Sequence, residues 1–151
     1  MPEQHDAFAE PPRTAEVVAA HAEEVALQRF RATYDPGRRP DLARALTDLA
    51  AVHDAAGRRL DALGPAEEAV AVHRDLVADD PARLPALAAA LDDLGVRCHE
   101  VGRSAHAVAR SREAVDLYRR LADADPAYRP HLAAATANLE RHRQAREPRT
   151  S

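Results

Sequence analysis

A unit of 45 residues recurs along this chain of 151 residues, and it limits the fold more than any other feature. Asp35-Pro36 returns as Asp80-Pro81 and again as Asp125-Pro126, with no gap in the register. Several other positions return at the same interval: Pro40, Pro85 and Pro130; Leu42, Leu87 and Leu132; Leu49, Leu94 and Leu139; Val25, Val70 and Val115; Arg29, Arg74 and Arg119. Self-similarity at a period of about 20 to 50 residues predicts a repeat array, in which each unit packs on its neighbours.

Each unit has the pattern of two helices. Apolar or semi-polar residues in its first half recur every three or four residues, which places them on one stripe of a helix. They are Leu42, Leu46, Leu49, His53 and Ala56, and one unit later Leu87, Leu91, Leu94, Cys98 and Val101. Pro40 and Pro85 suit a first helical turn, and Gly57 and Gly102 suit the C-terminal stop. The second half continues as another helix until the next Asp-Pro pair, because proline disfavours helix in the residue before it.

The two ends of the array are incomplete units. Residues 14–34 match only the second helix of a unit, and residues 130–146 match only the first. The last helix carries Thr136, Arg143 and Arg146 at stripe positions, which suits a polar cap. We therefore predict an all-α fold, a short α-solenoid of about six helices in antiparallel hairpins, over residues 13–147. Residues 1–12 and 148–151 are predicted to be disordered tails. Gly64-Pro65 predicts a kink or a broken first turn near Leu60 to Pro65.

Composition removes several classes of protein. All 21 positively charged side chains are arginine and there is no lysine or isoleucine, a bias that indicates a GC-rich bacterium such as an actinomycete. The net charge of -4 disfavours a broad basic face for nucleic acid. The longest apolar runs are too short to span a membrane, and the acidic N-terminus does not resemble a signal peptide. The single cysteine, Cys98, cannot form an internal disulfide. These features predict a cytoplasmic protein without nucleic-acid or membrane partners.

The spacing of Leu91, Leu94-Gly95, Gly102 and Ala114 resembles that of a tetratricopeptide repeat. Roughly residues 14–146 are similar to the long repeats of kinesin light chains and of many actinobacterial proteins. The chain departs from that pattern in two ways. Leu49-Ala50 replaces the Leu-Gly pair in one unit, and His53 and Cys98 replace the usual aromatic residue.

The resemblance implies a protein–protein interaction module with no cofactor. In this family the first helix of each pair lines a concave groove that holds a peptide or a partner domain. Carried over by position, the groove residues are Arg44, Thr47, Asp48, Asp54, Asp92, Asp93, Val96, His99, Glu100, Asn138 and Arg141. Asp48, Asp93 and Asn138 share the repeat position that forms an asparagine ladder in related proteins. With two carboxylates in that ladder, we expect an acidic groove and a basic partner. The alternative is a solvated acidic face without a ligand.

Two further hypotheses belong to other classes. His53, Cys98 and His99 could serve a small enzyme or a zinc site, since imidazole and thiolate ligate zinc. Against this, neighbouring first helices are predicted to be about 10 Å apart, and His99 points away from Cys98 on a helix. We therefore predict no metal ligands and no catalytic residues. The other hypothesis is a self-associating regulatory or structural repeat fragment, whose ends stack on further repeats or on a second copy. In the second case a homodimer would be held by apolar end faces around Val18, Val25 and Leu27.

Overall fold

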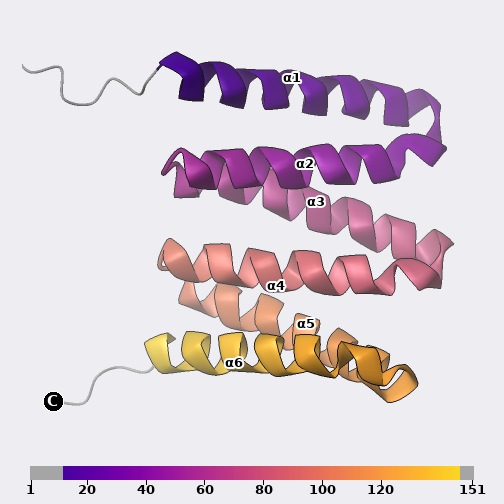
Figure 1. The fold of residues 1–151 in the computed structure, drawn as a ribbon, viewed down its shortest axis with the longest axis vertical. Coiled ribbons are helices and arrows are strands. Elements are labelled where there is room, and N and C mark those ends of the chain that lie inside the picture. The colour runs from indigo at the N-terminus through magenta and orange to yellow at the C-terminus, as the bar shows by residue number, and fades with distance from the viewer. Residues whose placement is uncertain (1–11, 147–151) are drawn as a thin grey trace, which may run out of the picture.

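A computed structural model describes residues 12–146, and these residues form six α-helices stacked in one direction (Figure 1). The predicted all-α fold of antiparallel helix hairpins is confirmed. The predicted tails lie outside the described residues, except that Pro12 already belongs to the first helix. The α-helices are α1 (Pro12–Tyr34), α2 (Arg39–Ala55), α3 (Arg59–Asp79), α4 (Leu84–Glu100), α5 (Ser104–Ala124) and α6 (Arg129–Arg146).

The Asp-Pro pairs do more than end a helix. Each proline opens a short 3-10 turn that leads directly into the next α-helix: η1 (Pro36–Arg38), η2 (Pro81–Arg83) and η3 (Pro126–Tyr128). The aspartate before each proline is in an extended conformation, and its carboxylate accepts a hydrogen bond from the backbone N–H two residues later. The distances are 2.9 Å for Asp35, 3.0 Å for Asp80 and 2.9 Å for Asp125. The same local bond therefore recurs at each junction between successive hairpins, where it caps the 3-10 turn.

The two glycine stops are left-handed, as a helix C-terminus of this kind requires. Gly57 has φ +73° and Gly102 has φ +78°. The next residue closes the motif, because the Arg58 N–H donates to the His53 carbonyl and the Arg103 N–H donates to the Cys98 carbonyl. A residue with a Cβ is strained in this region, so glycine is needed at both turns.

Of the kink or broken first turn expected near Leu60 to Pro65, the broken turn does not occur. Helix α3 begins at Arg59 and continues through Pro65 to Asp79. Besides crowding the carbonyl four residues earlier, proline clashes with the Cβ of the residue before it, and that residue here is Gly64, which has no Cβ. The glycine therefore lets the helix accept the proline at the cost of one hydrogen bond.

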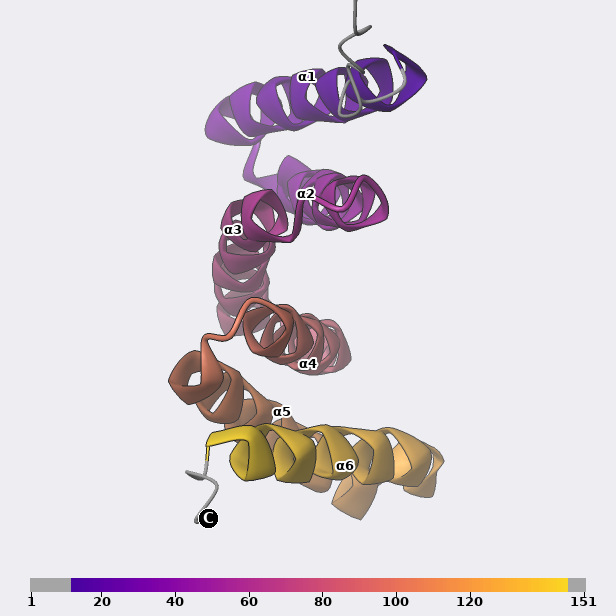
Figure 2. The ribbon, with the colours of Figure 1, turned by 90° about the vertical axis from the view of Figure 1, so that its left-hand side faces the viewer.

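The helices form two layers, with α2, α4 and α6 on one side and α3 and α5 on the other (Figure 2). The apolar core lies between the helices in three clusters, which follow one another along the stack. Its fully buried members include Leu46, Leu91, Leu94 and Val70. On the odd-numbered helices, two ion pairs repeat the same geometry: Arg29 to Glu68 and Arg74 to Glu113, each at 2.8 Å and each 39 residues apart. Equivalent side chains thus return to equivalent surroundings in successive units.

Candidate functional site

The predicted groove residues all lie on α2, α4 and α6, which form one face of the molecule (Figure 2). We call this surface the even-helix face. Six of the predicted residues are exposed on it: Arg44, Thr47, Asp48, Asp93, Glu100 and Arg141. The other five are half-buried: Asp54, Asp92, Val96, His99 and Asn138. The repeat register therefore brings the predicted set to one side of the array, although its members differ in how far they can reach a ligand.

Asn138 is already bonded within the protein. Its Nδ2 lies 3.1 Å from each carboxylate oxygen of Asp92, which ties α6 to α4. Its Oδ1 accepts a hydrogen bond from Arg141 at 3.2 Å. The amide is thus occupied on both sides. It holds two first helices together, a role different from that of the ladder asparagine implied by the resemblance.

Asp54 is also occupied. Its carboxylate accepts a hydrogen bond from Nε of Arg97 at 2.8 Å, which links α2 to α4. Arg97 was not among the predicted site residues, yet its half-buried guanidinium lies in the middle of the even-helix face. Beside it is a crevice of about 20 Å³, lined by Thr47, Ala50, Ala66, Ala69, Ala90, Asp93 and Arg97. A cavity of this size holds about one water molecule, so a ligand here would bind to a surface and not in a deep pocket.

Asp48 and Asp93 are the carboxylates left available. They occupy the same repeat position, both are exposed, and neither has an ion pair or hydrogen bond to its side chain among residues 12–146. The pKa of Asp93 is raised, first by desolvation where it lies between neighbouring helices and then by the negative charges of Asp92 and Asp54; Arg97 opposes this. Carboxylates crowded in this way are stabilised by an added positive charge.

Part of the charge on the even-helix face is paired within the protein. Arg97 pairs with Asp54, and Arg44 pairs with Asp41 at 3.0 Å. The remaining carboxylates still outnumber the guanidinium groups. Those carboxylates are Asp48, Asp54, Asp92, Asp93 and Glu100.

The residues considered for metal or nucleophilic chemistry are not arranged for it. Cys98 is buried in the apolar core, and burial raises the pKa of its thiol, assisted by the negative charge of Glu67 and opposed by Arg103 and Arg110. A thiol in this setting stays protonated and out of reach of a substrate. Within residues 12–146, no three His, Cys, Asp or Glu side chains converge in a way that could hold a metal ion.

A buried polar cluster joins α4, α5 and α6, and sequence reasoning did not find it. Ser111 and His142 are both fully buried, with Ser111 Oγ 2.8 Å from His142 Nδ1. The ring of His142 stacks on His99 with centroids 4.6 Å apart. A Cβ added to Gly95 would lie 2.7 Å from Ser111 Oγ, so the glycine makes room for the serine. Because Ser111 is inaccessible, this cluster is a structural contact between helices.

The two junctions between even-numbered helices use the same repeat positions with different chemistry. Asp54 and Arg97 form the ion pair between α2 and α4, and one unit later His99 and His142 form the ring stack between α4 and α6. The sequence could have indicated this correspondence, because each pair is separated by 43 residues.

The sequence matches no protein-family model, and comparison with curated proteins finds no relative. No helix among the described residues is both long and apolar enough to cross a lipid bilayer.

Proposed function

We propose that this protein is a protein–protein interaction module of the tetratricopeptide type, and that it binds a basic peptide or partner segment on the even-helix face. The observation that carries the proposal is the pair Asp48 and Asp93. They stand one repeat apart on the same face, exposed and without a partner in the described part of the chain. Arginine side chains pair with carboxylates through two parallel hydrogen bonds, so two such sites favour a segment with arginines at a matching separation.

The close crossing at Gly95 supports assignment to this repeat type. Leu94 is buried in the core, and Gly95 meets Ser111 on the second helix where an added Cβ would be only 2.7 Å from its oxygen. A Leu-Gly pair at this point is the feature on which the family resemblance rests, and the structure gives it a physical reason. The other unit reaches the same crossing with Ala50 and Ala66, two small residues.

The proposal is tested with an immobilised array of synthetic peptides of equal length that differ in their content of Arg, Lys, Glu and Ala. Binding by the full chain should favour arginine-containing peptides and weaken as salt is raised, since exposed charges are screened. The variant Asp48→Arg/Asp93→Arg should lose roughly tenfold or more in affinity for the best peptide, as expected where close charge pairs are replaced by repulsion.

The matched control reverses two exposed carboxylates on the odd-numbered helices, Asp75→Arg and Asp123→Arg. This variant has the same net charge as Asp48→Arg/Asp93→Arg, so it separates an effect of charge on the even-helix face from an effect of overall charge on binding. Equal loss in both variants, or no preference for basic peptides by the unmodified protein, would refute recognition on the even-helix face. Circular dichroism confirms that both variants remain helical.

A further inference from the structure

Helix α1 carries most of the exposed large apolar side chains of the described residues. Val17, Leu27, Phe30 and Tyr34 are 46%, 42%, 63% and 77% exposed, and the only other large apolar residue that is similarly exposed within residues 12–146 is Leu60, on α3. Val18 and Val25, which the sequence suggested for an apolar end face, are instead buried, and Val25 packs in a cluster with residues of α2. The open apolar surface is thus a different stripe of α1 from the predicted one, and it shares only Leu27 with it.

The equivalent positions in the other second helices show why this surface is unusual. Val17 corresponds to Ala62 and Ala107, which are fully buried against the first helix of their own hairpins. Helix α1 has no such partner among the described residues. Phe30 corresponds to Asp75 and Arg120, and Tyr34 to Asp79 and Ala124. The aromatic pair is therefore an addition to the repeat and not a requirement of it.

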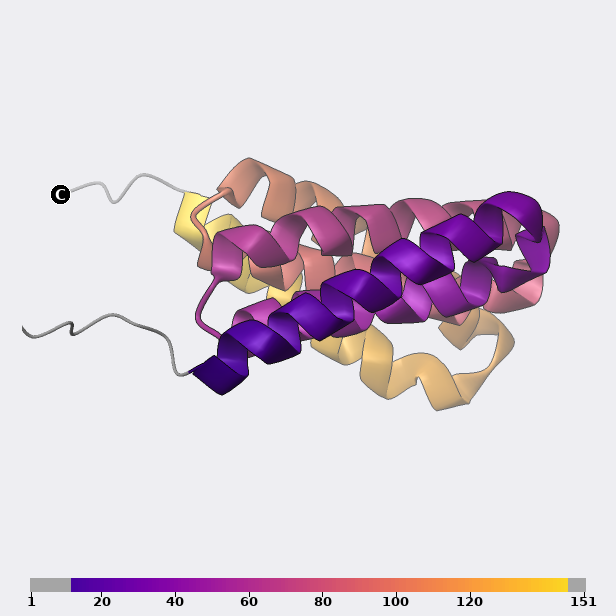
Figure 3. The same cartoon turned by 90° about the horizontal axis from the view of Figure 1, so that it is seen from above.

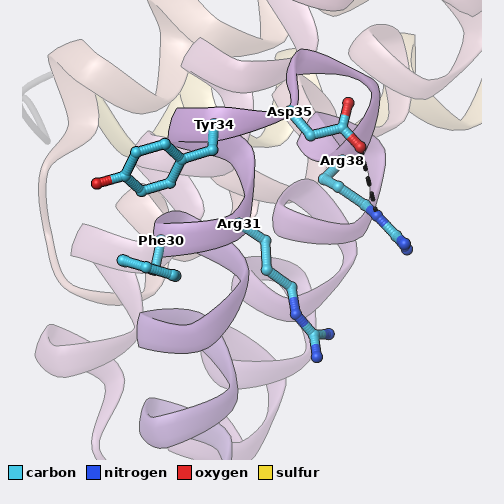
Figure 4. A pocket seen from close by; sticks show the side chains of 5 residues that line it. All are labelled: Phe30, Arg31, Tyr34, Asp35 and Arg38. Carbon is cyan, nitrogen blue, oxygen red and sulfur yellow. Dashed lines mark ion pairs between the residues drawn. The ribbon is translucent and has the colours of Figure 1, made fainter.

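Leu27 and Tyr34, together with Ala20, form a seam along α1, and Phe30 lies beside it. Val17 lies instead next to Val52, Ala55 and Ala56 of α2. Ala20, Leu27 and Tyr34 are spaced by seven residues, so they follow one line along the helix, as in a coiled-coil contact. Figure 3 looks down on α1 at the end of the array, with no other helix over it. The rings of Phe30 and Tyr34 are 5.1 Å apart and border an open depression of about 470 Å³ next to the η1 turn, with Arg31, Asp35 and Arg38 (Figure 4).

The charges beside the seam are self-complementary. Glu24 lies one turn before Leu27 and Arg31 one turn after it, on the same flank of the seam. If two copies of α1 pack antiparallel about Leu27, Glu24 of each helix faces Arg31 of the other, and small Ala20 faces large Tyr34. Arg31 has no ion pair within the described residues, so it is available for such a contact. An isologous contact of this kind is closed by a twofold axis and does not propagate.

We propose that the protein forms a homodimer through antiparallel packing of α1 against α1 of a second copy, with the twofold axis beside Leu27. A head-to-tail contact with α6 fits less well. The side of α6 that would receive a second helix presents Thr136, Glu140 and Arg143, which are polar. Among the helices of residues 12–146, a second α1 alone offers both the apolar seam and the matching charges. This dimer is independent of binding on the even-helix face, which lies on other helices.

Sedimentation equilibrium of the full chain tests the proposal. A concentration-dependent dimer is expected, since one helix face gives an interface near the lower end of the stable range. Leu27→Glu should raise the dimer dissociation constant by at least tenfold, as for a central apolar anchor. Leu60→Glu is the matched control, because Leu60 is also an exposed leucine but lies on α3, and it should leave the constant unchanged. A monomer at all concentrations, or a dimer insensitive to Leu27→Glu, would overturn the proposal.

A charge swap tests the antiparallel register. Glu24→Arg and Arg31→Glu should each weaken the dimer, and the double variant should recover it, since the pair is restored between copies. If the double variant instead loses as much dimer affinity as the two single variants together, this register is excluded.

Cross-linking gives a second readout that does not depend on charge. Leu27→Cys places two thiols at the twofold axis, and mild oxidation should give a disulfide-linked dimer that a reductant reverses. The native Cys98 is buried and does not compete. Leu60→Cys, the control, should remain monomeric on the gel. Cross-linking of Leu60→Cys at the same rate as Leu27→Cys would overturn the assignment of the surface.

Discussion

At the scale of single residues, each helix crossing depends on the sizes of the two side chains that meet there. One hairpin crosses with Ala50 against Ala66, and the next crosses with Gly95 against Ser111. In the second pair the residue on the first helix is smaller and the residue on the second helix is larger. The added hydroxyl, Ser111 Oγ, lies 2.8 Å from His142 Nδ1. The size change is therefore linked to the polar contact that holds α6.

The variant Gly95→Ala should destabilise the protein despite alanine's higher helix propensity. The new Cβ would sit 2.7 Å from Ser111 Oγ, so the hydroxyl must rotate away and leave His142 Nδ1 without its buried partner. That loss costs about 1 to 3 kcal/mol, against a gain of about 1 kcal/mol from propensity. Urea unfolding monitored by circular dichroism measures the difference.

The double variant Gly95→Ala/Ser111→Ala recreates the crossing of Ala50 and Ala66 and serves as the control. Its destabilisation should be smaller than the sum of the single variants by about 0.5 to 3 kcal/mol, since the residues touch. Strict additivity would show that the crossing at Gly95 is looser than the structure indicates.

At the scale of elements, the docking of α6 depends on a neutral histidine. Desolvation, followed by the charges of His99 and Arg141, lowers the pKa of His142 to about 4. In the unfolded chain the pKa of histidine is about 6.5, so between these values the unfolded state binds more protons. Stability is therefore full above about pH 6.5 and is lost as the pH falls toward 4, by up to about 3 kcal/mol.

The test compares urea unfolding at pH 7.5 and pH 5 in the unmodified protein and in His142→Gln. The variant keeps a hydrogen-bonding side chain but cannot titrate, so its stability should change less between the two pH values. His106→Gln, at an exposed position on α5, controls for the loss of any histidine. Parallel pH dependence in all three proteins would place the acid sensitivity elsewhere.

The elements also show what the sequence could and could not predict. The helices, their glycine stops and the hairpin order follow from periodicity, because apolar spacing and left-handed glycines are local properties. Two features were not predicted because each depends on the residue before a proline. The 3-10 turn at Pro36 depends on the hydrogen bond accepted by the Asp35 side chain, and the continuous helix through Pro65 depends on the missing Cβ of Gly64. The repeat register placed the site residues on one face. It could not show that Asn138 and Asp54 already bond to Asp92 and Arg97.

At the scale of the whole molecule, the array is stabilised unevenly. Helix α4 packs against α3 and α5 and also touches α6, whereas the backbone of α1 packs only on α2 and the η1 turn. Beyond these, α1 reaches α3 through the exposed ion pair of Arg29 and Glu68. The buried residues of α1 are two valines, Val18 and Val25, and Gln28. Helix α6, although terminal, contacts both α5 and α4. Because stability in a repeat array is a sum over neighbouring contacts, the N-terminal end should open more readily than the C-terminal end.

Native-state hydrogen exchange followed by mass spectrometry should show this gradient. Peptides from the centre of α4, around Leu91 and Leu94, should exchange slowest, those of α6 faster, and those of α1 fastest. The experiment is best done on Leu27→Glu, in which contact between two copies of α1 cannot add protection. In the unmodified protein at high concentration, α1 alone should then slow down, since that helix alone gains a partner. Exchange of α1 and α4 in a single cooperative step in the variant would show that the array opens as one unit, and that the hairpins do not contribute separately to its stability.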